Sequence, residues 1–160
     1  MSWSGAALLA GTVATGLMAG PFAAFSYAVM PGLGRTDDAT FVQSMQRINV
    51  AILNPFFGLC FGGALVLTAL AVLLHRGRAP LSWIVAGLVL YVLVLVVTFA
   101  VNVPLNNRLD AATGDPATAR AAFEAAWVRW NAVRTVLCTA AFGCLCWALV
   151  LHGRLAGPTG

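Results

Sequence analysis

The chain has 160 residues, of which 61% are hydrophobic and only 9% are charged, and its formal net charge is +4. All nine basic residues are arginines, and they are too few and too scattered to indicate nucleic-acid binding. The composition leaves no room for a soluble module. We therefore expect a single integral membrane domain over residues 1–160, in contact with the lipid bilayer.

Four long segments carry no charged side chain once histidine is set aside. They cover residues 1–34, 48–75, 79–107 and 135–153. About 20 apolar residues, each rising about 1.5 Å, cross a bilayer core, so each segment predicts one transmembrane helix. The first segment has no basic leader and exceeds the apolar run of a signal peptide, so we expect it to remain as a mature span.

Prolines, glycines and acidic residues mark the predicted helix ends. The helices are expected near residues 4–30, 38–74, 81–109 and 116–152. Asp37 or Asp38 can cap the second helix, and Asp115 can cap the fourth. Pro104 lies near the end of the third helix, where it removes a donor and crowds the carbonyl of Ala100.

The predicted fold is an all-α, up-down bundle of four transmembrane helices. Both termini and the turn at residues 75–80 then share one side, while every polar cluster lies on the other. The second and fourth helices would each be about 50 Å long against a core of about 30 Å, so they should extend beyond the bilayer on that side. Arg76, Arg78 and Arg154 have no acid nearby, which favours cytoplasmic termini, although the opposite side carries more arginines.

The fourth helix carries a polar stripe. At about 100° per residue, Trp127, Trp130, Asn131 and Arg134 share an arc of about 100° that should face inward. An unpaired polar group in lipid costs several kcal/mol, so these side chains are expected to line a site. Arg129 points about 160° away and is more simply a headgroup or solvent contact.

The third helix repeats this pattern. Tyr91, Thr98, Asn102 and Asn106 fall within about 80° of one another. Asn107 and Arg108 lie at the edge where the helix ends, close enough for Arg108 to be a candidate contact.

The second helix places Met45, Asn49, Phe56 and Cys60 on one face, with Gln46 beside them. Asn54 lies about 140° from Asn49 on an ideal helix. The proline after Asn54 frees a backbone carbonyl, so Asn54 either turns inward or bonds that carbonyl.

Simpler interpretations remain open for these residues. Asn and Gln in membrane helices often hydrogen-bond neighbouring helices, and tryptophan near a helix end is often an interface residue. The small-residue pairs Gly16 with Gly20 and Gly58 with Gly62 favour close packing of the first helix on the second; contact between copies in a homo-oligomer is the alternative.

Metal, haem and disulfide chemistry lack a pattern. The four cysteines lie inside predicted spans without a CxxC, so they are expected to be structural, and we expect no metal and no cofactor. The only histidines, His75 and His152, lie at the terminal side, far from the polar stripe, where they could face each other.

Several motifs together resemble the anthrone oxygenase family. They occupy residues 30–33, 45–49 with 54–56, 104–109 and 127–135, in order along nearly the whole chain. The resemblance implies a four-helix membrane protein, some of whose fungal relatives oxidise anthrones to anthraquinones without an evident metal or flavin. Many bacterial members have no assigned substrate. This chain has Ala132 where many relatives are expected to carry a histidine, which puts a histidine base in doubt.

The resemblance predicts a membrane-embedded, cofactor-independent oxygenase of a lipophilic aromatic, such as an anthrone or a quinol. Arg134, helped by Asn131 and Asn106, would stabilise a developing oxyanion. The remaining candidates would bind substrate: Gln46, Asn49, Asn54, Asn102, Arg108, Trp127 and Trp130. A base is missing, with Glu124 as the only acid plausibly near the mouth and water as the other option. A protein that binds or transports a lipophilic ligand, or a structural membrane subunit, are the alternatives.

Overall fold

The structure is a computed structural model that describes residues 2–156 of the chain. Its elements, in order, are α1 (Trp3–Ala24), η1 (Phe25–Val29), α2 (Met30–Leu33), α3 (Asp38–Ala51), α4 (Pro55–Leu74), α5 (Leu81–Val97), η2 (Thr98–Asn102), α6 (Val103–Asp110) and α7 (Pro116–Ala156). The elements η1 and η2 are five-residue π-helical turns.

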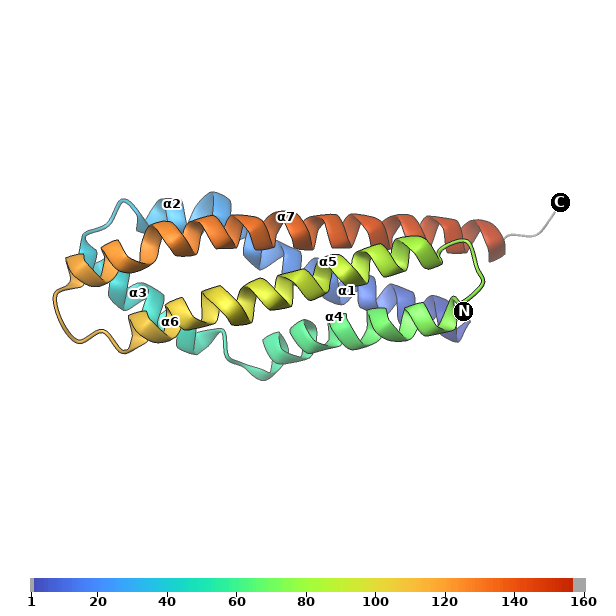
Figure 1. The fold of residues 1–160 in the computed structure, drawn as a ribbon, viewed down its shortest axis with the longest axis horizontal. Helices are drawn as coiled ribbons and strands as arrows, with labels where there is room; N and C mark the ends of the chain where they lie inside the picture. The colour runs from blue at the N-terminus through green and yellow to red at the C-terminus, as the bar shows by residue number, and fades with distance from the viewer. Residues whose placement is uncertain (1, 157–160) are drawn as a thin grey trace.

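Four helical segments are long and apolar enough to cross a membrane. They are Trp3–Leu33, Pro55–Leu74, Leu81–Asp110 and Pro116–Arg154. Figure 1 shows them lying side by side along the long axis, with the start of α1, the α4–α5 turn and the end of α7 at one end of the molecule. The opposite end holds α2, α3, α6 and the start of α7. The predicted four-span, all-helical membrane bundle is therefore confirmed.

The second predicted helix, residues 38–74, is not continuous. It breaks between α3 and α4, where the Asn54 side chain accepts a hydrogen bond from the Phe57 amide and donates one to the Ala51 carbonyl, both at 2.9 Å. Pro55 is the first residue of α4 and has no amide hydrogen to continue the helix from α3. The backbone therefore restarts in a new phase at this point.

Two other membrane segments contain a π-turn two residues before a proline. The Met30 amide bonds the Phe25 carbonyl ahead of Pro31, and the Val103 amide bonds the Thr98 carbonyl ahead of Pro104. Because proline cannot donate to the carbonyl four residues back and crowds it, the backbone widens by one residue instead of breaking. The expected distortion near Pro104 takes this form.

Small residues let α1 pack tightly on its neighbours. A Cβ atom on Gly11 would lie 3.0 Å from Thr68 Oγ1 on α4, and one on Gly16 would lie 2.8 Å from the Phe142 ring on α7. A Cβ on Gly58 or Gly62 would meet nothing within 4 Å. A Cβ on Gly20 would also meet nothing, and Gly16 contacts α7 rather than α4. The expectation that these glycine pairs pack α1 against α4 is therefore wrong, and α4 turns its own pair outward.

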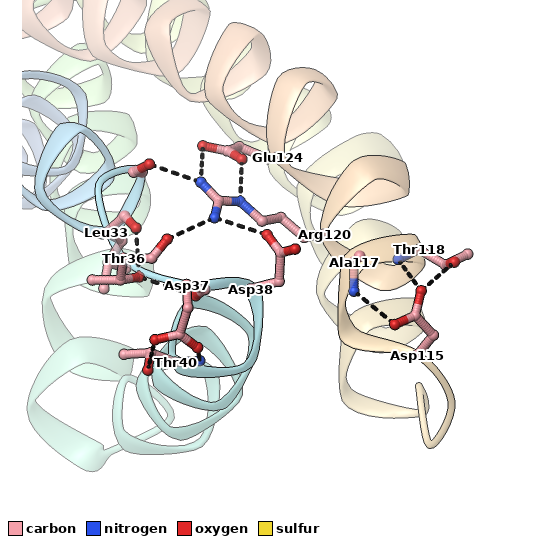
Figure 2. A network of polar contacts seen from close by, with 11 residues as sticks. Leu33, Thr36, Asp37, Asp38, Thr40, Asp115, Ala117, Thr118, Arg120 and Glu124 are labelled. Atoms are coloured by element: carbon pink, nitrogen blue, oxygen red, sulfur yellow. Dashed lines mark hydrogen bonds and ion pairs between the residues drawn. The ribbon is translucent and has the colours of Figure 1, made fainter.

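Arg120 fastens the start of α7 to the segment between α2 and α3 (Figure 2). Its guanidinium donates to the carbonyls of Gly34 and Thr36 at 2.9 Å, and to the carboxylates of Asp38 at 3.0 Å and Glu124 at 2.7 Å. A single side chain thus joins the N-terminal quarter of the chain to the last helix.

Two exposed aspartates cap helices at the same end of the molecule. Asp37 accepts from the Thr40 amide at 2.9 Å and opens α3, while Asp115 accepts from the Thr118 amide at 3.1 Å and opens α7 (Figure 2). Of the two cap candidates for α3, Asp37 takes the role and Asp38 pairs with Arg120.

Candidate functional site

A cavity of about 90 Å³ lies between α1, α3, α4, the third span and α7, at the level of both π-turns. Its apolar wall consists of Pro21, Phe22, Phe25, Met45, Ile48, Ile52 and Phe57. Its remaining lining residues are Asn49, Thr98, Asn106, Trp127, Asn131 and Arg134. The predicted inward faces of three helices therefore meet around one space.

Arg134 is the only charged residue among those lining the cavity, and its side chain is only 7% exposed. Its Nη2 donates to Asn131 Oδ1 at 2.8 Å, while its buried Nε has no hydrogen-bond partner among the described residues. The guanidinium carbon lies 4.6 Å from the centre of the Phe22 ring and 5.4 Å from that of Trp127. Aromatic faces stabilise a cation but do not neutralise it, so donor capacity remains.

Asn131 positions this guanidinium. Its Nδ2 donates to the Phe22 carbonyl at 3.0 Å and to Ser26 Oγ at 2.9 Å, which ties α7 to α1 and η1. A carbonyl can only accept, so the amide orientation is settled by chemistry and Oδ1 must face Arg134. Both ends of the Asn131 amide therefore bond groups of the protein itself.

Trp127 and Asn106 form a second polar contact at the cavity. The indole Nε1 donates to Asn106 Oδ1 at 2.8 Å. Because an indole nitrogen only donates, the Asn106 amide is also oriented, and its Nδ2 is left without a partner among the described residues. The Trp127 ring lies against Phe25 and Phe123, with centroid distances of 5.4 and 5.9 Å.

Gln46 and Asn49 both reach from α3 to the end of α6. Gln46 Nε2 donates to the Leu109 carbonyl at 2.9 Å, and Asn49 Nδ2 donates to Asp110 Oδ1 at 3.0 Å. Asn49 lines the cavity, whereas Gln46 does not. Gln46 therefore acts as interhelical attachment, and Asn49 serves both the attachment and the cavity wall.

Asn102 is 1% exposed, and neither its Nδ2 nor its Oδ1 has a partner within the described residues. It belongs to η2, between the cavity residues Thr98 and Asn106, but does not itself line the cavity. A fully buried amide with unmet hydrogen bonds is costly, so this position is a strained point next to the site.

Three predicted contacts lie away from the cavity. Asn54 is exposed, and its side chain bonds the backbone on both sides of the α3–α4 break. Arg108 is exposed and lines a separate groove between α6 and α7, and Trp130 is half-buried outside the lining. The phase change at the break also turns Phe56 outward, 67% exposed, and brings Phe57 to the cavity in its place.

The acid suggested as a base is engaged elsewhere. Glu124 pairs with Arg120 and is not among the cavity residues, which include no acid and no histidine. Asp110, which sequence reasoning passed over, is the acid that touches a cavity residue, through Asn49.

The first helix supplies a wall that sequence reasoning missed. Pro21, Phe22 and Phe25 line the cavity, and Ser26 holds Asn131. The segment has no charged or amide side chain, so its prolines and aromatic residues were the only features of the sequence that could have indicated that it lines the cavity. The two histidines do face each other, with His75 Nε2 3.0 Å from His152 Nδ1, where α4 ends and α7 approaches its own end.

The fold and the site define a multi-pass membrane protein in which the four spans and α3 line a mostly apolar cavity with one buried arginine. A model of the anthrone oxygenase family, described as "Anthrone oxygenase", matches residues 50–144 of this chain. The match covers more than half of the chain, so the protein belongs to the anthrone oxygenase family. No curated protein and no solved structure matches the chain significantly.

Proposed function

We propose that this protein oxidises a lipophilic aromatic of the anthrone or quinol type with dioxygen, without a cofactor. The observation that carries the proposal is Arg134, a buried guanidinium with unused donors held between aromatic rings at a cavity. Membership of the anthrone oxygenase family supports the same substrate class.

The reaction needs few groups from the protein, because the deprotonated substrate reacts with dioxygen directly. An anthrone loses a proton to give an electron-rich enolate, which reacts with dioxygen to give a hydroperoxide; loss of water from that hydroperoxide leaves the quinone carbonyl. Overall, one anthrone and one dioxygen yield one anthraquinone and one water. Arg134 and the free Nδ2 of Asn106 would stabilise the enolate oxygen in a water-poor site, which lowers the barrier to the first step.

The ring system would lie against Trp127, Phe22 and Phe25, which supply the flat apolar surfaces that line the cavity. The cavity of about 90 Å³ is smaller than the roughly 300–1,000 Å³ of drug-sized ligand sites, so binding a tricyclic ring requires it to widen. The α3–α4 break is the expected place, because Ile52 and Phe57 line the cavity there while Leu53 is 81% exposed.

The proposed membrane placement rests on the same features. At about 1.5 Å per residue, α7 is about 60 Å long, twice a hydrocarbon core. We place the histidine end and the termini at the cytoplasmic surface, with α3, α6 and the start of α7 beyond the opposite boundary. The cavity would then lie near that boundary, within reach of a ligand dissolved in lipid.

The test is turnover of purified protein with a panel of anthrones and quinols, following quinone absorbance and oxygen uptake. Arg134→Gln should lower kcat/KM by at least about 100-fold, the typical cost of one oxyanion donor. Arg129→Gln makes the same change on the exposed side of α7 and should retain activity. Full activity of Arg134→Gln would refute the proposal.

A binding or transport role is the second candidate, favoured by the lack of an acid or histidine among the cavity residues. In the enzyme, water must accept the substrate proton. If the panel quenches the tryptophan fluorescence of the protein but yields no quinone and consumes no oxygen, the protein is a binding protein and not an oxygenase.

A further inference from the structure

The hydrogen bonds around the cavity fix which polar atoms a ligand meets. Asn106 presents a donor, because its Oδ1 is occupied by the Trp127 indole. Arg134 contributes a second donor at the cavity, because its hydrogen bond to Asn131 uses only Nη2 and its Nη1 makes no hydrogen bond within the described residues. Both donors come from the third span and α7, so the cavity has one wall that favours a carbonyl or an oxyanion.

Asn49 differs from these residues. It lines the cavity from α3, it is 7% exposed, and its Nδ2 donates to Asp110 Oδ1 at 3.0 Å. An ionised carboxylate can only accept, so the reverse amide orientation would set two acceptors against each other. Asp110 therefore holds Asn49 with Oδ1 as the free polar end. Within the described residues, no group donates to that oxygen.

We propose that Asn49 Oδ1 is the acceptor for a hydroxyl group on the bound aromatic, and that Asp110 is the positioning residue that keeps this oxygen available. The ligand class is then narrower than a lipophilic aromatic: a planar ketone or quinone that carries a protonated hydroxyl apart from its carbonyl oxygen. This inference rests on the proposed site for an aromatic ligand, but it does not require turnover.

The distinguishing measurement is equilibrium binding of three unreactive probes to the full-length protein in detergent, followed by tryptophan fluorescence. The probes are 2-hydroxyanthraquinone, 2-methoxyanthraquinone and anthraquinone, at a pH below the pKa of the phenol. In the 2-hydroxy isomer the hydroxyl cannot bond its own ring carbonyl. The hydroxy probe should bind about 3- to 10-fold more tightly than the methoxy probe, the value of one hydrogen bond.

The variants then assign the preference to residues. Asn49→Leu should bind the hydroxy and methoxy probes equally, since the acceptor is gone. Asp110→Asn should reduce the preference, because an amide partner no longer fixes the orientation of Asn49. Asp115→Asn makes the same substitution at an exposed cap five residues away and should keep the wild-type ratio. A purely structural effect would weaken all probes by the same factor and leave the ratio unchanged.

Two results with the wild-type protein alone overturn the proposal: equal affinities for the hydroxy and methoxy probes, or no binding of any probe. An unchanged preference in Asn49→Leu overturns the acceptor assignment, and one in Asp110→Asn overturns the positioning role. A clear hydroxyl preference without quinone formation from anthrones would support this subsite while refuting the oxygenase. The two proposals therefore fail separately.

Discussion

At the scale of single residues, Arg134 is expected to lower the stability of the folded protein, because its charge is buried without a carboxylate partner in the described part of the chain. Its charge is 7% exposed, faces two aromatic rings and makes one hydrogen bond, and it has no carboxylate partner in the described part of the chain. Removing an ion from water costs several kcal/mol even after relaxation, and a single amide bond does not repay that. A residue kept only for packing would be apolar.

We therefore expect Arg134→Met to unfold at the same temperature as the wild type or at a higher one. Replacing a buried ion pair by apolar side chains is often neutral or stabilising by about 1–4 kcal/mol. Arg134 lacks even a pairing carboxylate in the described part of the chain, so removing its desolvation cost should offset the lost bond to Asn131. Thermal unfolding in a single detergent measures this. Arg120→Met is the contrasting variant and should lower Tm, because Arg120 bonds two carbonyls and two carboxylates. A large fall in Tm for Arg134→Met would make Arg134 structural instead.

The predictability of the site also differs residue by residue. Arg134, Asn131, Trp127 and Asn49 could be placed at one cavity because helical phase is reliable within an uninterrupted helix. Asn106 also lines the cavity, although η2 interrupts the third helix before it. Phase fails where the helix is interrupted, and so Phe57 could not be distinguished from Phe56 or Asn54 placed as a cap. The apolar wall from α1 carries no polar signal, and the link from Asn49 to Asp110 joins residues 61 apart in the sequence.

At the scale of elements, the two π-turns help to shape the cavity. The first contributes Phe25 and the second Thr98, and each precedes a proline. A π-turn adds one residue to the helix and so rotates the next helical segment by about 100° relative to an unbroken α-helix. The particular orientation of Asn106, beyond η2, toward the Trp127 indole is set by that rotation.

Pro104→Ala should let η2 relax to regular α-helix, because the missing amide hydrogen returns and the ring no longer crowds the preceding turn. Asn106 would then rotate relative to Trp127, and the 2.8 Å hydrogen bond from the indole would be lost. We expect ligand binding to weaken at least about 10-fold, because the Trp127–Asn106 hydrogen bond is lost and Asn106 no longer lines the cavity in the same position. Circular dichroism should show unchanged helix content. Pro80→Ala, in the α4–α5 turn, is the control and should bind normally. Wild-type affinity in Pro104→Ala would show that η2 has no such role.

The helix caps at the cavity end predict a dependence on pH. The hydrogen bond from the Thr40 side chain lowers the pKa of Asp37 from 3.8, and the one from Thr118 does the same for Asp115. A lowered pKa means that the ionised cap stabilises the helix above pH 3.8 and that this contribution is lost as the pH falls through the lower folded value. Above about pH 5 no change is expected.

Hydrogen exchange should therefore speed up at the Thr40 and Thr118 amides below about pH 4, relative to the intrinsic exchange rate, while amides in the spans stay protected. Asp37→Asn keeps a good cap that does not titrate, so the change at Thr40 should disappear in this variant and persist at Thr118. Equal pH dependence in both proteins would assign the effect to another group.

At the scale of the whole molecule, the four spans and their up-down order can be predicted directly from charge-free runs and short turns, since lipid allows few other ways to satisfy the backbone. The contacts between helices cannot be predicted in this way. Gly11 and Gly16 make the close approaches of α1, while the Gly58 and Gly62 face of α4 is open, and a homo-oligomer through that face stays a prediction.

The bond from Asn131 to the Phe22 carbonyl joins residues 109 apart, and Arg120 bonds Gly34 and Thr36, which are 86 and 84 residues away. The first span and the last one therefore hold the arginine between them. During synthesis the first three spans enter the membrane before α7 exists. A nascent chain can thus have most of its helices in lipid and still lack the cavity, which is complete only when the final span docks.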